Sequence, residues 1–388
     1  MPASVDFLVV GAGFAGLVLA ERLSTQLGKT CLVVDRRSHI GGNAHDEYDA
    51  AGVLVHRYGP HYFRTNSDLV RNYLSQFTAW LPAEYRVLSH AEGRLWPFPI
   101  SLATFEQFIG RPSTSEEFAA WLERERRPIA QPANSEEFVL SKVGPRFYAM
   151  FYEHYTRKQW GRPARELEPG VCGRVPVRLD RNHSYVSDAF QALPRDGYHR
   201  LFQNMLLAAA PRVEVRLNAD YREVAASVAA KHLIYTGPID EYYGHRFGRL
   251  PYRTLRFEFE SFDAEQLKAR APIVGKSGFW QEALQINYPA HPSLTRVVEL
   301  KHATGQQCDA TTIVREYPGE CGPGQEPYYP VPAAEPVSLY RRYRELADTD
   351  AGVTFVGRLA NYRYYNMDQI VALALQEFEK LRARFGPR

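Results

Sequence analysis

The feature that most constrains this chain is a glycine-rich turn between two apolar segments near its start. Residues 6–10 end in a continuous apolar run, and the turn Gly11-Ala12-Gly13-Phe14-Ala15-Gly16 follows at once. An apolar pattern of helical period then covers residues 17–27 and stops at Gly28, and residues 31–34 form a second apolar strand. This strand–turn–helix–strand order, with parallel strands, predicts a dinucleotide-binding unit of the Rossmann type.

Each glycine of the turn has its own physical role. Gly11 permits the tight turn, Gly13 lets backbone N–H groups approach a pyrophosphate, and Gly16 lets the helix pack closely on the strand. The helix N-terminus then faces the anion. Asp35 ends the second strand, where a carboxylate accepts hydrogen bonds from a ribose hydroxyl.

A second glycine pair distinguishes between flavin and nicotinamide nucleotides. Gly41 and Gly42 follow soon after Asp35, an arrangement that resembles the FAD-binding domains of amine oxidases and related flavoproteins. The segment Gly357-Arg358, with a helix that starts near Asn366, resembles the closing element of that fold. Only one glycine-rich fingerprint is present, so we expect FAD and no separate domain for NAD(P)H.

Composition excludes several other classes of function. The chain has 388 residues and a formal net charge of +3, which gives no general reason to expect nucleic acid or a charged membrane surface as a partner. No apolar run reaches the roughly 18 residues of a spanning helix. The four cysteines lie far apart and the first residues do not resemble a signal peptide. We therefore expect a cytoplasmic protein without membrane insertion and without a structural metal.

The order of patterns along the chain predicts an α/β fold: a Rossmann-type FAD-binding domain with a helical insertion and an antiparallel β-sheet domain. We assign residues 1–75, 195–250 and 331–388 to a discontinuous FAD-binding domain. Residues 102–170 form the helical domain, and residues 76–101, 171–194 and 251–330 form the antiparallel sheet that holds the substrate. We expect the last helix to run from about Met367 to Phe385, with Asn366 as N-cap and Gln369 closing a capping box.

Several longer runs resemble the bacterial UDP-galactopyranose mutases. They follow the family's order over nearly the whole chain, and several have unusual composition. They include Gly59-Pro60-His61-Tyr62-Phe63-Arg64-Thr65-Asn66, Tyr155-Thr156-Arg157-Lys158-Gln159-Trp160-Gly161, Arg174-Val175-Pro176-Val177-Arg178, Tyr235-Thr236-Gly237-Pro238-Ile239-Asp240, Glu316-Tyr317-Pro318 and Glu326-Pro327-Tyr328-Tyr329-Pro330-Val331.

Arginines and tyrosines are suited to bind a diphosphate, since guanidinium groups stay charged and tyrosines donate hydroxyls from flat apolar rings. The resemblance implies that Arg174 and Arg296 hold the two phosphates. It places His61 and Trp160 beside the flavin and the sugar, and we group these four as catalytic. The implied substrate-binding residues are Phe151, Tyr155, Tyr185, Asn287, Tyr329, Tyr364, Arg64, Ser101 and Val186.

The cofactor site expected from the turn and from the resemblance has its own set of residues. It consists of Gly11, Gly13, Phe14, Gly16, Asp35, Arg36, Gly42, Asn43, His61, Arg358, Asn366 and Met367.

Some positions depart from the resemblance. Arg64 stands where most relatives have a second histidine, and Ser101 replaces a usual asparagine. Val186, Leu294, Asn366 and His154 also differ from the residues common in the family. These changes fall near the expected flavin, sugar and base contacts, so they are either neutral drift or a sign of an altered sugar or base.

The resemblance implies a flavin-dependent, non-redox isomerase that converts UDP-galactopyranose to UDP-galactofuranose. In that family the N5 of reduced flavin forms a transient bond to the sugar, so the FAD must be reduced by an external reductant such as NAD(P)H. One alternative is the same chemistry on another nucleotide sugar: a deoxy, N-acetyl or pentose analogue. Others are an FAD oxidoreductase of the amine-oxidase type and a binding protein without activity. The sequence leaves open whether the chain forms a homodimer.

Overall fold

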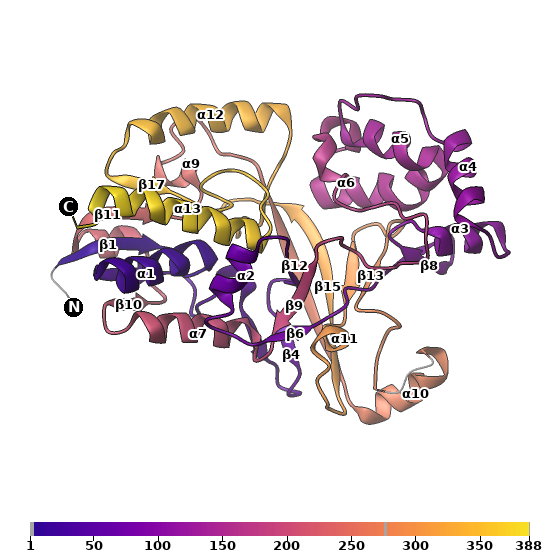
Figure 1. Ribbon diagram of the computed structural model, residues 1–388, viewed down its shortest axis with the longest axis horizontal. Coiled ribbons are helices and arrows are strands. Elements are labelled where there is room, and N and C mark those ends of the chain that lie inside the picture. The colour runs from indigo at the N-terminus through magenta and orange to yellow at the C-terminus, as the bar shows by residue number, and fades with distance from the viewer. Residues whose placement is uncertain (1–3, 275–277, 388) are drawn as a thin grey trace.

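The computed structural model describes residues 4–274 and 278–387. A five-stranded parallel sheet carries the glycine turn (Figure 1). Phe7 and Val9 on β1 belong to one hydrophobic core and Leu8 between them belongs to another, as expected where successive side chains point to opposite faces. Its strand order is β10 (Val213–Arg216), β2 (Cys31–Val34), β1 (Ser4–Val10), β11 (Ala229–Tyr235) and β17 (Val353–Phe355).

Helices cover both faces of this sheet, which is why its central strands are apolar on both sides. On one face, α1 (Phe14–Leu27) packs between α7 (Gly197–Ala209) and α13 (Met367–Phe385). On the other face, α9 (Ile239–Tyr242) and α12 (Ala334–Thr349) share a core with β11 and β17. Figure 1 shows α12 and α7 at opposite edges of this domain, with the sheet between them.

The ends of two helices lie where the sequence predicts them. Gly28, with a φ of +64°, ends α1, and its N–H donates to the carbonyl of Ser24. The side chain of Asn366 caps the N-terminus of α13, and the side-chain oxygen of Gln369 accepts a hydrogen bond from the backbone N–H of Asn366. In both helices the capping residue lies next to the helix in the sequence, so the helix boundary could be predicted from local sequence.

A seven-stranded sheet forms the second layer. Its pairs are antiparallel except for one, because β13 and β7 run parallel. All its strands come from the segments 76–101 and 251–330. The order is β16 (Tyr329–Pro330), β12 (Tyr252–Phe262), β15 (Thr311–Glu320), β14 (Arg296–Val298), β13 (Gln285–Asn287), β7 (Val87–Ala91) and β8 (Arg94–Phe98).

A helical arm stands beside this sheet, at the upper right of Figure 1. Its core is aromatic, with Phe105 stacked on Phe118. Gly144, with a φ of +74° and a ψ of 178°, interrupts the helical geometry, so the chain turns before it continues through a π-helical segment. The arm comprises α3 (Leu102–Ile109), α4 (Ser115–Glu125), α5 (Ser135–Phe147), η2 (Tyr148–Glu153) and α6 (His154–Trp160).

A small three-stranded sheet joins the two larger ones. Its central strand β9 (Phe190–Pro194) pairs with β5 (Phe63–Thr65) and with β6 (Trp80–Pro82). The remaining elements are η1 (Gly42–Ala44), β3 (Asp46–Tyr48), β4 (Leu54–His56), α2 (Asp68–Leu74), η3 (Ala164–Glu166), η4 (Pro169–Val171), α8 (Tyr221–Ala225), α10 (Ala264–Val274) and α11 (Lys301–Thr304). Within the described residues no helix is long and apolar enough to span a membrane.

Candidate functional site

The glycine turn opens onto a cavity of about 260 Å³ at the carboxyl edge of the parallel sheet. Gly11 has a φ of +103°, and Gly13 precedes α1 without a side-chain cap, so the first N–H groups of α1 remain for an anion. A Cβ on Gly16 would lie 2.0 Å from the carbonyl oxygen of Gly11. Only glycine lets α1 approach the strand this closely.

Asp35 anchors the opposite side of the turn. Its Oδ2 accepts a hydrogen bond of 2.8 Å from the N–H of Ala12, and its Oδ1 accepts one of 2.9 Å from the N–H of Arg37. Arg36 forms an ion pair with Glu241 at 3.0 Å. The Asp35 carboxylate is therefore fixed at the cavity wall, where each oxygen still has a lone pair for a hydroxyl group.

Most of the predicted cofactor residues line this first cavity. Gly16 instead packs α1 on the strand, and Asn366 lines a neighbouring cavity. The predicted residues at the wall are Gly11, Gly13, Phe14, Asp35, Arg36, Gly42, Asn43, His61, Arg358 and Met367. Thr236, Tyr328 and Glu326 also line it, and sequence reasoning did not single them out as cofactor contacts.

A second cavity of about 130 Å³ adjoins the first. The two share five wall residues: Asn43, His61, Tyr328, Arg358 and Met367. The second cavity is also lined by Arg64, Arg296, Tyr329 and Tyr364, which the sequence predicts as substrate residues. A ligand in one cavity can therefore reach a ligand in the other past His61 and Arg358.

Arg296 enters the second cavity from β14. Its Nε donates to Oε2 of Glu316 at 2.7 Å, and the Glu316 side chain is fully buried. Burial by itself lowers the pKa of Arg296, but Glu316 and the tyrosines Tyr155, Tyr329 and Tyr85 outweigh it and hold that pKa well above its ordinary value. Since the ion pair uses Nε, both terminal nitrogens of Arg296 have no hydrogen-bond partner among the described residues.

Arg174 lines neither cavity, but it lies against Tyr364 at the wall of the second. Its guanidinium lies 3.8 Å from the centre of the Tyr364 ring, and its Nη2 donates to the Tyr364 carbonyl at 3.3 Å. Burial lowers the pKa of Arg174, and the nearby cations Arg358 and Arg64 lower it further. Within the part of the chain that the structure describes, Arg174 forms no ion pair, so its charge is available to an anionic ligand.

The other two arginines at the site are held by protein groups. Arg64 forms an ion pair of 2.5 Å with Asp188, a residue that the sequence did not single out. Arg358 donates to the carbonyl oxygen of Tyr365 at 2.7 Å. The site therefore combines Arg174 and Arg296, which have free donors, with two positioned arginines.

Tyr329 and Tyr364 line the second cavity, and further aromatic rings pack behind them. Trp160 at the end of α6 contacts the rings of Tyr329 and Tyr364, with centroids 6.0 and 5.9 Å away. Burial raises the pKa of Tyr155, Tyr185 and Tyr329, so their hydroxyls stay protonated as donors at neutral pH. Rings close to a diphosphate site supply donors without adding negative charge.

Asn287 is oriented by a chain of buried hydrogen bonds. The Tyr85 hydroxyl donates to Gln285 Oε1 at 2.6 Å, and Gln285 Nε2 donates to Asn287 Oδ1 at 2.7 Å. Tyr85 also contacts the ring of Tyr185. Sequence reasoning missed Tyr85 and Gln285, because only the pairing of β7 with β13 brings them together.

Six of the predicted substrate residues line neither cavity: Phe151, Tyr155, Tyr185, Asn287, Ser101 and Val186. Ser101 is fully buried and caps α3, where its Oγ lies 3.3 Å from the hydroxyl of Thr104. Phe151 is 3% exposed and contacts the rings of Trp96, Phe98 and Phe147. Val186 is also buried, and its carbonyl accepts from Arg178.

His61 lies where the two cavities meet. Its N–H donates to His56 Nδ1 at 2.9 Å, and its own Nδ1 lies 2.8 Å from the carbonyl oxygen of Gly59. Burial lowers the pKa of His61 to about 4, so its imidazole is neutral near pH 7. Gly59 has a φ of +82°, and a Cβ there would lie 2.8 Å from Glu316, which shows how closely this loop packs on the Arg296–Glu316 pair.

Family models match both parts of the chain. The UDP-galactopyranose mutase model matches residues 150–364, and an NAD(P)-binding Rossmann-like domain matches residues 9–77. A probable UDP-galactopyranose mutase of Klebsiella pneumoniae is 34% identical over 375 residues, which cover 96% of this chain and 93% of the relative. A dTDP-fucopyranose mutase of Escherichia coli is 33% identical, over 95% of this chain and 96% of the relative.

Solved structures agree at the level of the fold. The crystal structure of a reduced UDP-galactopyranose mutase superposes with a TM-score of 0.70 at 15% identity, covering 98% of this chain and 96% of that one. A putrescine oxidase superposes with a TM-score of 0.61 at 12% identity, covering 99% of this chain and 100% of that one. From the family model and the full-length relatives, the chain belongs to the UDP-galactopyranose mutase family.

Proposed function

We propose that this protein is an FAD-dependent mutase that interconverts the pyranose and furanose forms of UDP-galactose. The observation that carries the proposal is the meeting of the two cavities at His61 and Arg358. The first has the glycine turn and fixed carboxylate that suit a dinucleotide. The second has the arginines and tyrosines that suit a sugar diphosphate.

The residues of the first cavity fit FAD. The uncapped N-terminus of α1 suits a pyrophosphate, and Asp35 suits a ribose hydroxyl. Gly42, Asn43, His61 and Met367 would then lie along the flavin end, next to the second cavity. When bound and reduced, the flavin supplies a nucleophilic ring nitrogen, and an external reductant such as NAD(P)H supplies the electrons.

In the second cavity this chain's own residues bind and orient the sugar nucleotide. The free donors of Arg174 and Arg296 hold the diphosphate and stabilise it as it departs from the sugar carbon. The tyrosine hydroxyls add uncharged donors, and Trp160 packs against the rings of Tyr329 and Tyr364. Since His61 is neutral near pH 7, the positive charge that attracts the phosphates comes from the arginines.

A related substrate is the second candidate. The Escherichia coli relative, a dTDP-fucopyranose mutase, is almost as similar to this chain as the Klebsiella pneumoniae relative. Arg64, one of the departures from the family pattern, lines the second cavity and is paired with Asp188. The same reaction on a deoxy sugar attached to thymidine diphosphate is therefore worth testing beside UDP-galactose.

One assay separates these functions. Purified protein, loaded with FAD, is incubated with UDP-galactopyranose before and after reduction by dithionite, and the products are separated by chromatography. We expect furanose product only after reduction, with many turnovers per reducing equivalent. Equal turnover by oxidised enzyme under air contradicts the mutase proposal, and oxygen consumption in proportion to product indicates an oxidase. A panel that adds dTDP-linked 6-deoxygalactose ranks the two sugar nucleotides.

A further inference from the structure

Lys158 joins two parts of the site that are distant in sequence. It lies on α6, between Tyr155 and Trp160, and its Nζ donates to three backbone carbonyls. These belong to Tyr288 at 2.5 Å, His291 at 2.5 Å and Leu294 at 2.8 Å. All three acceptors lie in the loop that connects β13 to β14.

That loop sets the position of two substrate residues. β13 ends at Asn287 and β14 begins at Arg296, and these two residues are directly paired across the hairpin. Within the loop, His291 Nδ1 accepts from the N–H groups of Ser293 and Leu294. Any shift of the loop against α6 moves Arg296 relative to Tyr155 and Trp160.

The helix that carries Lys158 is itself fixed. Arg253 on β12 donates to the carbonyls of Lys158 and Gln159 at 2.9 and 3.0 Å, which satisfies the C-terminal end of α6. A Cβ on Gly161 would lie 2.5 Å from Arg253. Because α6 is held at its end, the three bonds from Lys158 determine where the loop lies.

We propose that Lys158 is a positioning residue for nucleotide-sugar binding, which holds the loop of residues 288–294 on α6 and so aligns Arg296 with the aromatic wall. This proposal rests on the proposed function. An ammonium group has three N–H donors, one for each carbonyl, whereas a neutral amine has two. Loss of the proton therefore leaves at least one of the three carbonyls without its partner.

The protonation state of the Lys158 side chain changes within the pH range in which binding can be measured. Burial lowers the pKa of Lys158 to about 8. The ionisable groups on the elements around it are engaged elsewhere: Glu316 on β15 pairs with Arg296, Arg315 on β15 pairs with Glu260, and Arg253 caps α6. His291 in the loop accepts from backbone N–H groups, and Arg157 and His154 on α6 are exposed.

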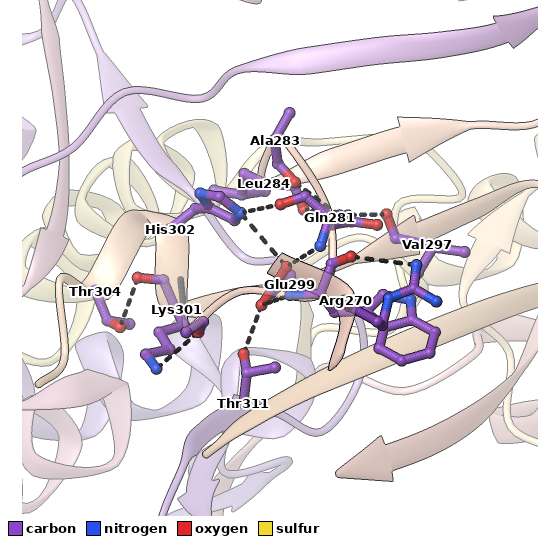
Figure 2. A network of polar contacts seen from close by, with 12 residues as sticks. Arg270, Gln281, Ala283, Leu284, Val297, Glu299, Lys301, His302, Thr304 and Thr311 are labelled. Atoms are coloured by element: carbon purple, nitrogen blue, oxygen red, sulfur yellow. Dashed lines mark hydrogen bonds and ion pairs between the residues drawn. The ribbon is translucent and has the colours of Figure 1, made fainter. Parts of the chain in front are cut away.

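The chain offers a matched control in Lys301. Its Nζ also donates to three backbone carbonyls, those of Gly278, Cys308 and Ala310. It lies beside the buried Glu299, whose carboxylate accepts from Thr311 and from the backbone of Gln281 (Figure 2). This second lysine lies on α11, apart from α6 in Figure 1, and neither it nor its acceptors line the two cavities.

The experiment measures the dissociation constant of UDP by titration calorimetry between pH 7.0 and 9.0. It uses FAD-loaded wild type, Lys158→Met and Lys301→Met, each checked for flavin content and thermal unfolding. For the wild type we expect affinity to weaken by about tenfold across this range, following one ionisation near pH 8. Lys158→Met should bind UDP about tenfold more weakly at pH 7.0 and show no alkaline loss. Lys301→Met should keep the wild-type affinity and pH dependence while unfolding at a lower temperature.

Three results overturn the role of Lys158: a flat wild-type affinity up to pH 9.0, wild-type affinity in Lys158→Met, or an equal loss in Lys301→Met. If Lys158→Met does not fold, the wild-type series alone decides the question. If the wild type turns over UDP-galactopyranose but its affinity for UDP does not change with pH, the proposed function stands and only the role of Lys158 fails. A wild type that binds no UDP contradicts the proposed function and the role of Lys158 together.

Discussion

At the scale of single residues, the site depends on how each positive charge is paired. Glu316 uses only the Nε of Arg296, and Arg174 stacks on Tyr364 without an ion pair among the described residues. In Arg64, by contrast, a terminal nitrogen donates a hydrogen bond to the carboxylate of Asp188. These pairings determine which arginines can bind a diphosphate.

Arg174→Ala and Arg296→Ala should each reduce kcat/KM strongly while the bound flavin stays unchanged, because each removes a charged donor from the diphosphate. Loss of one hydrogen bond to a charged group costs about 1.5–3 kcal/mol, or roughly ten- to over a hundredfold. Steady-state kinetics with reduced enzyme measures the effect. Arg146→Ala is the control, because Arg146 forms an exposed ion pair with Glu92. Wild-type kcat/KM in both site variants would remove Arg174 and Arg296 from the mechanism.

Two of the departures from the family pattern should behave differently. Arg64→His removes a permanent charge from the cavity wall and frees Asp188, so it should change the ratio of kcat/KM between UDP-galactose and dTDP-linked 6-deoxygalactose. Ser101→Asn should leave that ratio unchanged and lower the melting temperature, since a larger amide must fit a fully buried cap. The same ratio in Arg64→His and wild type would indicate neutral drift at this position.

The sequence indicated which residue types to expect at the site, but not which other residues hold those side chains in place. The glycine turn and Asp35 could be placed because their roles depend on neighbours within about thirty residues of sequence. Asp188 and the Tyr85–Gln285–Asn287 chain could not, because they meet through strand pairings that no local pattern encodes. Ser101, assigned to the substrate by resemblance, is a helix cap in the structure.

At the scale of elements, helix ends were predicted more accurately than strand neighbours. The last helix has the predicted bounds, Met367–Phe385, because its capping residues adjoin it in sequence. The parallel pairing of β13 with β7 had no such signal, since both strands show only short apolar runs. Strand order across a sheet depends on contacts far apart in sequence, which a single sequence does not display.

The bend in the helical arm gives an element-scale prediction. Gly144 has a φ of +74°, and a Cβ there would lie 2.3 Å from the carbonyl oxygen of Glu125 on the preceding helix. Gly144→Ala should therefore lower the free energy of unfolding by about 3 kcal/mol, from backbone strain plus the steric clash. Denaturant titration measures the change.

Gly110→Ala is the matched control for this variant. Gly110 also has a φ of +74°, yet a Cβ there meets nothing within 4 Å. It should cost only about 1 kcal/mol, the strain of the left-handed backbone. Equal losses of unfolding free energy in the two variants would show that the close contact with Glu125 adds no cost beyond the backbone strain.

At the scale of the whole molecule, buried neutral histidines make stability depend on pH. Burial lowers the pKa of His45, His61 and His232 to about 4. In the unfolded chain these imidazoles bind a proton near pH 6.5, so between about pH 6.5 and pH 4 the unfolded state holds more protons. Their contribution to stability is complete above pH 6.5 and is lost as the pH falls through 4.

Urea titrations at a series of pH values test this dependence. Each such histidine should remove on the order of 1 kcal/mol of unfolding free energy per pH unit within that window. His232→Asn should reduce the slope by about that amount without affecting catalysis, since His232 contacts Thr354 and the ring of Phe385 away from both cavities. Identical slopes in variant and wild type would contradict a neutral buried His232.

The return of the chain to its first domain has a consequence for biosynthesis. β17 completes one edge of the parallel sheet, α13 packs on α1, and Gly357, Arg358, Met367 and Ile370 complete the wall of the first cavity. These segments follow the glycine turn by more than 300 residues, so they leave the ribosome long after it. Until they do, the part of α1 that packs on α13 is exposed, and one wall of the first cavity is missing. A nascent chain that holds only residues 1–350 therefore has an incomplete first cavity and an α1 without its contacts to α13.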